Sequence, residues 1–324
     1  MRRLATGALL LAAAACGVTG DDLEGSWAVH HRVEGGAVLS VWGSSPDDVW
    51  AAGGTTDRGI VLHGDGEVWT EMDTGATSML WWIYGFAPDD VYAVGERGVI
   101  LHYDGASWQR AESGTDLALY GVWGASGGDV WIVGGDPARA GSAVVLRGRG
   151  TSFRTVGDLP ADLRPSAFFK AYGYAEDDVI IVGTEGTVVR WNGTRWWREE
   201  VPTGEALFSL WGRGRDDLYA VGGWTAGTVL HFDGGGWTAV DDTAGAGLSG
   251  VFTAPDSPTI AVGPAAYVLE ILPDGTETEP ALPEVAPEMA LHGVWGDSAG
   301  TTYAVGGDML SVDGPSSGVI VRRR

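Results

Sequence analysis

Four aromatic side chains are the residues best suited to binding chemistry, because they occupy the same position in successive copies of a sequence repeat. They are Trp81, Tyr120, Phe169 and Phe208. Neighbouring rings form an apolar platform on which a carbohydrate or a peptide can pack. The spacing therefore predicts an aromatic binding surface. The alternative is that these rings pack beneath neighbouring loops as core, because apolar residues that enter a strand are mostly buried.

Polar and charged residues accompany these aromatic positions. The predicted ligand-binding set also contains Arg58, Arg97, Arg139, Trp224 and His292. Guanidinium and imidazole groups can orient a ligand by hydrogen bonds. Lys170, the only lysine, directly follows Phe169, and we expect it at the same surface.

Patterns for catalysis and metal binding are incomplete. Two G-x-S-x-G matches, at Ser126 and Ser316, lack the strand, sharp turn and helix that a nucleophile elbow needs. His63, His102 and His231 share one repeat position in three different copies, so their side chains cannot converge on one metal ion. We predict no catalytic residue, no metal site and no cofactor.

The composition is acidic and rich in glycine and tryptophan. The chain has 324 residues, of which 53 are glycine and 16 are tryptophan, and this favours many tight turns over a helical bundle. A net charge of −23 excludes binding to nucleic acid by phosphate neutralisation. One cysteine excludes a disulfide framework.

These residues belong to one repeat that occurs seven times. The copies align on Gly43, Gly85, Gly124, Gly173, Gly212, Thr253 and Gly296. The mean interval of about 42 residues is typical of a four-stranded propeller blade. No segment has a sustained helical period with caps. We predict an all-β fold over residues 23–324, a seven-bladed β-propeller with four antiparallel strands per blade.

Two turns recur in the repeat. Before the fourth strand stand Asp65-Gly66, Asp104-Gly105, Asn192-Gly193, Asp233-Gly234 and Asp274-Gly275. Such pairs predict type I′ hairpins, in which both central residues have positive φ. Between the first and second strands lies the column Asp48, Asp90, Asp129, Asp178 and Asp217. We expect these carboxylates to accept backbone N–H groups and fix the turn, because adjacent pairs such as Asp47-Asp48 offer too few oxygens for calcium.

The two ends of the repeat array complement each other. The seventh copy stops after its third strand, at residues 318–322, and residues 24–30 match the fourth-strand pattern around Trp27. We expect the N-terminal strand to close the last blade, because closure removes exposed strand edges. We also expect a monomer.

The first residues form a targeting segment. Arg2 and Arg3 precede an apolar run at residues 4–15, which is too short to span a bilayer, and Cys16 follows. This arrangement resembles a bacterial lipoprotein signal, in which the cysteine is lipid-modified. It implies a signal peptide at 1–15, a lipidated linker at 16–22, and lipid attachment to the outer membrane or surface of the bacterial cell envelope. The alternative is ordinary cleavage after Ala15, which would leave a periplasmic or secreted protein with a free thiol.

The repeat also resembles a family. The pattern W-G-x-S-x-x-D-V-W-A-V-G, at Trp42 and Trp123, is followed by H-x-D-G-x-x-W and resembles repeats of bacterial exported and surface β-propeller proteins. It resembles the Asp-box of sialidases only distantly, since no residue separates Asp from Gly, and sialidase chemistry is not carried over. The resemblance implies the fold and names no activity.

These observations lead to three hypotheses for function. The first is an exported lipoprotein, held at the membrane only by lipid, whose propeller is a non-catalytic scaffold for a protein or glycan partner. The second is a propeller enzyme, a glycoside hydrolase or lyase acting on an extracellular polysaccharide. Glycosidases need two positioned carboxylates, and spacing marks no pair among Glu34, Glu96, Asp136, Glu185 and Asp308. The third is a structural component of the envelope.

Overall fold

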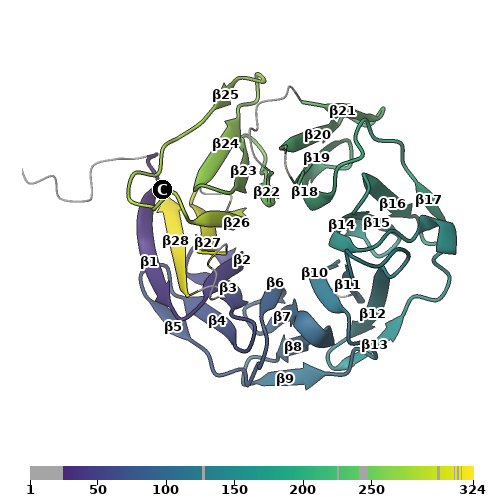
Figure 1. Cartoon of the computed structure of the whole chain (residues 1–324), viewed down its shortest axis with the longest axis horizontal. Coiled ribbons are helices and arrows are strands. Elements are labelled where there is room, and N and C mark those ends of the chain that lie inside the picture. The colour runs from purple at the N-terminus through teal and green to yellow at the C-terminus, as the bar shows by residue number, and fades with distance from the viewer. Residues whose placement is uncertain are drawn as a thin grey trace, which may run out of the picture.

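Short apolar strands alternate with turns along the chain, and each set of four strands forms one antiparallel sheet. The computed structural model describes residues 25–125, 128–224, 226–240, 247–297, 300–309, 311, 314 and 316–324. Seven sheets surround a central axis, with the first strand of each blade innermost (Figure 1). This arrangement confirms the seven-bladed β-propeller. Cys16, the rest of residues 1–22 and Ser126 lie outside the described residues.

The first three blades each use four consecutive strands, ordered outward from the axis. Blade one contains β2 (Ala37–Ser45), β3 (Asp48–Gly54), β4 (Gly59–Gly64) and β5 (Trp69–Glu71). Blade two contains β6 (Leu80–Ala87), β7 (Asp90–Gly95), β8 (Ile100–Tyr103) and β9 (Trp108–Ala111). Blade three contains β10 (Ala118–Gly124), β11 (Val130–Gly135), β12 (Val144–Arg149) and β13 (Ser152–Thr155).

The remaining blades follow the same order until the ring closes. Blade four contains β14 (Phe168–Ala175), β15 (Asp178–Gly183), β16 (Thr187–Trp191) and β17 (Trp196–Arg198). Blade five contains β18 (Leu207–Gly214), β19 (Asp217–Gly222), β20 (Thr228–Phe232) and β21 (Trp237–Ala239). Blade six contains β22 (Gly250–Phe252), β23 (Thr259–Gly263), β24 (Tyr267–Ile271) and β25 (Glu277–Thr278). Blade seven contains β26 (Ala290–Gly296), β27 (Thr302–Gly307), β28 (Ser317–Arg323) and β1 (Ala28–Glu34).

Helical structure in the described part of the chain is limited to two single 3₁₀ turns. These are η1 (Glu96–Gly98) and η2 (Ala161–Leu163). No helix among the described residues has the length and apolarity needed to cross a membrane.

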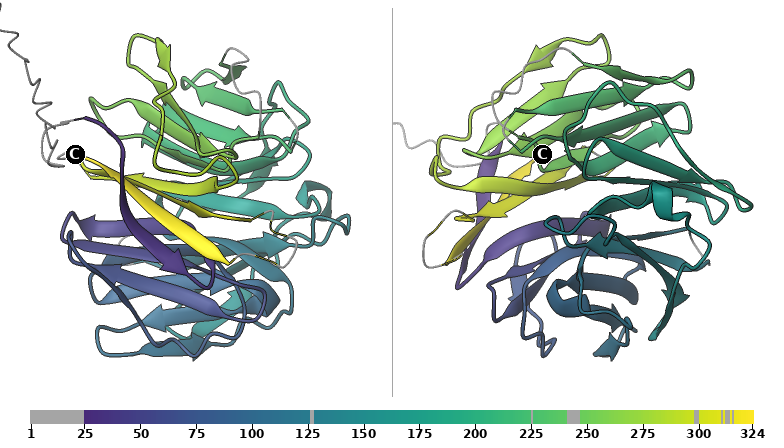
Figure 2. Two further views of the ribbon diagram at one scale, coloured as in Figure 1. Left: turned by 60° about the vertical axis from the view of Figure 1, so that its left-hand side comes forward. Right: turned by 45° about the vertical axis from the view of Figure 1, so that its right-hand side comes forward.

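The N-terminal strand closes the ring as predicted. β1 pairs antiparallel with β28, from Ala28 opposite Arg322 to Glu34 opposite Ser317. Figure 2 shows the two strands side by side, with β1 as the outer strand of blade seven. Trp27, just before β1, is buried and donates from its indole nitrogen to Glu270 of β24 at 3.2 Å. The N-terminal strand therefore connects blade seven to blade six as well.

The column of aspartates acts differently from the sequence prediction. Asp48 Oδ1 lies 2.7 Å from His63 Nε2 and accepts from the Trp50 indole nitrogen at 3.2 Å. His63 in turn stacks on Trp50, with ring centroids 4.1 Å apart. His102 with Asp90 and His231 with Asp217 repeat the pair in blades two and five, at 2.7 and 3.0 Å. The expectation that these carboxylates accept backbone N–H groups was wrong, because side chains occupy them instead: a histidine in blades one, two and five, and Arg147 and Arg215 at Asp129 and Asp178.

The turns before the fourth strands also differ from the prediction. In blade one the turn spans residues 65–68, and Asp65 Oδ1 accepts the backbone N–H groups of Glu67 and Val68 at 3.0 and 2.8 Å. Only the glycine, Gly66, has positive φ, at 89°. The hairpin is therefore not type I′. The carboxylate organises a longer turn, and its backbone donors hold the pKa of Asp65 below its ordinary value.

Candidate functional site

A β-bulge positions the predicted aromatic residues. In blade two the register shifts between Leu80 and Trp82, so Trp81 is left without a partner in the ladder. The same shift leaves Tyr120, Phe169 and Phe208 unpaired in blades three to five, and Leu39 and His292 in blades one and seven. A bulge re-aims the side chain of its extra residue. The repeat thus sends one side chain from each of blades two to five and seven to the mouth of the channel, whereas Leu39 of blade one is fully buried.

The aromatic side chains form the predicted crescent. The centroid distance is 5.5 Å from Trp81 to Tyr120, 5.2 Å from Tyr120 to Phe169, and 5.1 Å from Phe169 to Phe208. Trp224, from the loop between β19 and β20, extends the series at 4.6 Å from Phe208. Phe169 is buried, the other three strand residues are half-buried, and Trp224 is 63% exposed. The rings therefore pack on one another, as core residues do, and still border open space.

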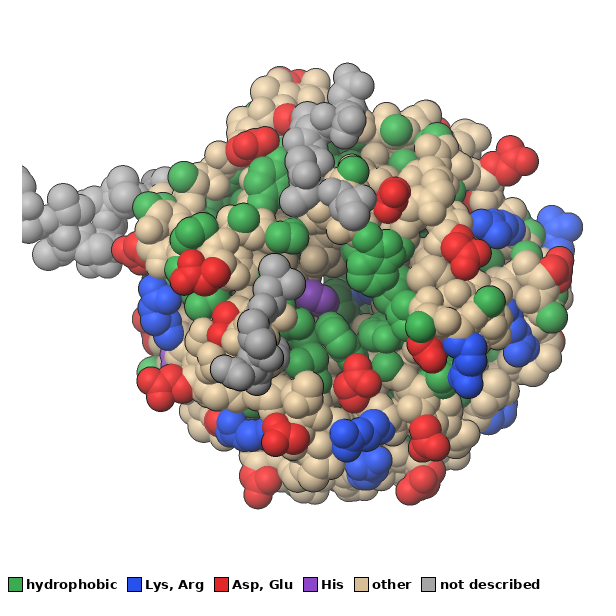
Figure 3. Space-filling view, in the orientation of Figure 1, with side chains coloured by type: hydrophobic (Ala, Val, Ile, Leu, Met, Phe, Trp, Pro, Cys, Tyr) green, Lys and Arg blue, Asp and Glu red, His purple; other side chains and the backbone are tan. Residues whose placement is uncertain are grey.

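The crescent lines a pocket of about 370 Å³ at the mouth of the channel. Figure 3 shows hydrophobic side chains gathered around this central hollow. Besides the crescent and His292, the pocket is lined by Trp82, Pro137, Gly223, Gly247, Ser249, Pro264, Ala290 and Met309. The volume falls within the range of about 300–1,000 Å³ for small-molecule pockets. None of the described residues that line it is an aspartate or a glutamate.

Few polar groups line the pocket. His292 Nδ1 donates to the Leu39 carbonyl at 2.8 Å, and burial lowers the pKa of His292. The imidazole is therefore neutral at pH 7, and its Nε2 carries a lone pair. Burial and the nearby carboxylates raise the pKa of Tyr120 to about 12, so its hydroxyl keeps its proton. The pocket offers an acceptor and a donor within an apolar wall.

Carboxylates near the mouth have partners of their own. Glu96 accepts from the Trp81 indole nitrogen at 2.7 Å, which fixes that ring against η1. Asp308 accepts from the backbone N–H groups of Ser316 and Ser317, at 2.8 and 3.0 Å. These bonds give both carboxylates a role in loop geometry.

Three arginines of the predicted site lie outside the pocket lining. Arg58 forms an ion pair with Glu71 at the outer strand of blade one. Arg97 adopts φ of 56° within η1, and Arg139 is exposed between β11 and β12. The sequence predicted these arginines as part of the ligand-binding set, but their side chains do not border the pocket that the aromatic residues share.

Lys170 is buried, whereas the sequence analysis placed it at the surface of the mouth. Its side chain is 1% exposed, and its Nζ lies 3.0 Å from the ring centroid of Trp82. Both residues occupy the position after the bulge. In the other five copies this position is small: Ser40, Gly121, Ser209, Gly250 and Gly293. The sequence alone thus distinguishes Trp82 and Lys170 as the two large residues at a position that is otherwise small. These two side chains meet beneath the pocket.

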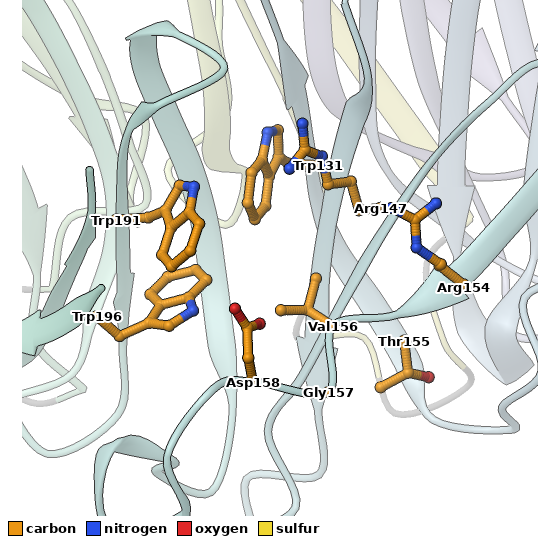
Figure 4. Close-up of a pocket in the computed structure, with 9 residues that line it drawn as sticks. All are labelled: Trp131, Arg147, Arg154, Thr155, Val156, Gly157, Asp158, Trp191 and Trp196. Atoms are coloured by element: carbon orange, nitrogen blue, oxygen red, sulfur yellow. The ribbon is translucent and has the colours of Figure 1, made fainter. Parts of the chain in front are cut away.

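A second hollow lies between blades three and four, near the outer strands. Figure 4 shows Trp191 and Trp196 on one side of it and Arg147 and Arg154 on the other. Its volume is about 180 Å³, below the range of about 300–1,000 Å³ for ligand pockets. Trp196 also packs edge-on against Trp131 at 6.0 Å, so the tryptophans serve the contact between the blades.

Comparisons with known proteins support the fold. The sequence matches no protein-family model and no curated protein. The structure is similar to YCF48 from Cyanidioschyzon merolae, with a TM-score of 0.69, 13% identity, and coverage of 92% of this chain and 98% of that chain. It is also similar to YCF48 bound to D1 peptide, with a TM-score of 0.65, 13% identity, and coverage of 92% and 96%. Virginiamycin B lyase from Staphylococcus aureus gives a TM-score of 0.71 at 12% identity, with coverage of 91% and 99%. At identities this low, the structural similarity shows a shared propeller fold and nothing more.

Proposed function

We propose that this propeller is a non-catalytic binding scaffold and that the pocket at the channel mouth holds an apolar segment of a protein partner. The observation that carries the proposal is the crescent of five aromatic residues around one open pocket. Exposed apolar surface of this kind is characteristic of binding sites, because a monomer gains nothing by leaving it in water.

The ring geometry favours a protein segment over a glycan. Successive rings from Trp81 to Trp224 meet at interplanar angles between 56° and 76°. Crossed rings form a concave wall that fits a side chain, whereas a sugar stacks on one open flat face. A solved propeller of similar fold is recorded with a bound peptide, which supports the same kind of partner here.

Removing both ends of the crescent tests the proposal. We expect Trp81→Ala combined with Trp224→Ala to lose the binding of short peptides that the parent protein selects from a displayed library. Each lost aromatic anchor costs about 2 kcal/mol or more, so the pair, taken as additive, lowers affinity by roughly several hundredfold or more. An array of immobilised glycans, probed with the same proteins, measures the glycan alternative.

The matched control is Val68→Ala, which removes an exposed apolar side chain from the turn before β5. This variant is expected to bind the selected peptides with the same affinity as the parent protein. Peptides that bind the double variant as tightly as the parent would show that the pocket is not their site. Glycans that bind the parent and are lost in the double variant would replace the protein partner with a sugar.

We also propose that the protein is exported and attached to the bacterial envelope by a lipid on Cys16. The support is the sequence alone, in which the single cysteine follows the apolar run at residues 4–15. A lipid anchor would leave the propeller free to meet a partner at the membrane surface.

Substituting the cysteine tests the anchor. We expect Cys16→Ser to move the protein from the membrane fraction to the soluble fraction of a bacterial host, because the serine hydroxyl cannot form the thioether. Blots of both fractions and intact mass measure the change. Equal membrane association of parent and variant would contradict the proposal.

A further inference from the structure

Lys170 is a buried amine with no counter-ion among the described residues. Among the described residues, no carboxylate or hydrogen-bond acceptor pairs with its Nζ, whereas Arg190, a half-buried arginine, pairs with Glu199 at 2.5 Å. Burying an unpaired charge is unfavourable, so proteins pair such groups or keep them neutral. Burial accordingly lowers the pKa of Lys170. The described residues therefore leave this amine without an ionic partner.

The position of Lys170 links it to the pocket. Its Nζ lies 3.0 Å from the ring centroid of Trp82 and 5.6 Å from that of Trp211. Trp82 lines the pocket, and so does Phe169, the residue before the lysine. A negative group at the floor of the pocket would approach the amine through apolar surroundings, where electrostatic attraction is screened far less than in water.

We propose that the pocket binds an apolar group that ends in a carboxylate, and that Lys170 supplies the positive charge that recognises it. This inference rests on the proposed binding function of the pocket. The aromatic wall holds the apolar part, and the carboxylate lies at the floor towards Lys170. The arrival of the carboxylate gives the protonated amine the partner that the described residues do not provide.

The same geometry selects against cations. An aromatic wall alone can attract an ammonium group through the negative faces of its rings. Here the face of Trp82 is already covered by the Lys170 amine, so that face is not open to the ammonium group of a ligand. A preference for an anionic over a cationic ligand therefore distinguishes this pocket from an aromatic cage for ammonium ligands.

Three probes with one skeleton test the preference: 4-phenylbutyrate, 4-phenylbutyramide and 4-phenylbutylamine, measured by titration calorimetry at constant ionic strength. We expect the acid to bind at least about tenfold more tightly than the amide, and the amine to bind most weakly. In Lys170→Met the acid loses its advantage while the amide keeps its affinity. Arg110→Met, which removes an exposed arginine from β9, controls for the change in net charge and is expected to behave like the parent.

The outcomes separate this inference from the proposed function. If the amide binds and the acid has no advantage, the role of Lys170 is overturned and the pocket keeps its binding role. If no probe binds, both proposals fall. An unchanged preference for the acid in Lys170→Met also overturns the inference. Methionine is expected to fold, since an apolar side chain of similar size replaces an unpaired charge, and the comparison of acid with amide in the parent stands without any variant.

Two further probe pairs identify the source of the carboxylate. One pair is N-acetyl-Leu-Phe with a free or an amidated C-terminus, and the other is decanoate against decanol. A preference for the acid confined to the peptide pair indicates a peptide C-terminus, and one confined to the alkyl pair indicates a fatty acid. Equal affinities within both pairs would contradict the proposal.

Discussion

Deletion of residues 25–34 is expected to unfold the propeller or drive it to aggregate. The deletion removes β1, its full ladder with β28, and the buried side chain of Trp27. Loss of a buried tryptophan alone typically costs about 3–5 kcal/mol, a large part of the roughly 5–15 kcal/mol by which domains are stable. The deletion also exposes the edge of β28, and an unpaired edge strand recruits other chains.

The contacts of Trp27 add to this loss. Its indole nitrogen donates to Glu270, which also pairs with Arg323, and the Arg323 guanidinium lies 5.3 Å from the Trp27 ring. Without the tryptophan, the buried Glu270 keeps only part of its hydrogen bonding.

Denaturant unfolding and size-exclusion chromatography measure the outcome of the deletion. A chain that begins at Gly25 keeps β1 and serves as the control, so it is expected to unfold at the same denaturant concentration as the parent. A deletion variant that stays monomeric and unfolds with the control would show that β1 does not hold the ring closed.

The fold was predictable because a repeat states the same information seven times. The interval between copies predicted a four-stranded blade. The incomplete seventh copy, together with the strand pattern around Trp27, predicted that the N-terminal strand completes the last blade. Side-chain partners were less predictable. The backbone N–H groups near Asp48 and the imidazole of His63 are both chemically suitable partners for this carboxylate, and only the packing of β4 beside β3 decides between them.

The candidate site was predictable where it follows strand order and not where it depends on side-chain length. The crescent follows from one repeat position, so Trp81 and Phe208 were placed correctly. Arg58 was not, because a long side chain in a loop reaches whichever carboxylate is nearest, here Glu71. Lys170 was placed on the correct strand, but its side chain is buried because it packs over the Trp82 ring of blade two.

A glycine opposite each bulge is expected to be indispensable for both stability and the pocket. Gly222 of β19 pairs with Leu207, directly before the bulge at Phe208. A Cβ atom at Gly222 would lie 1.9 Å from the Ala206 carbonyl oxygen, which is backbone and cannot rotate away. A Cβ atom would lie similarly close, 2.0–2.3 Å from a backbone carbonyl oxygen at or just before the start of the first strand, at Gly53, Gly95, Gly134, Gly183 and Gly306. Only the absence of a side chain allows the first strand to bulge here.

Gly222→Ala is therefore expected to cost about 3 kcal/mol, the upper part of the usual range for overpacking, because the strands must separate. The shift would also move Phe208 and weaken binding of 4-phenylbutyramide in the pocket. Gly236→Ala is the matched control, since no atom lies within 4 Å of the added Cβ, and its unfolding free energy is expected to stay within about 1 kcal/mol of the parent. Urea unfolding and calorimetry measure both effects. Equal stability of the two variants would show that β18 can relax without its bulge, and the account of how the repeat aims its aromatic residues would then fail.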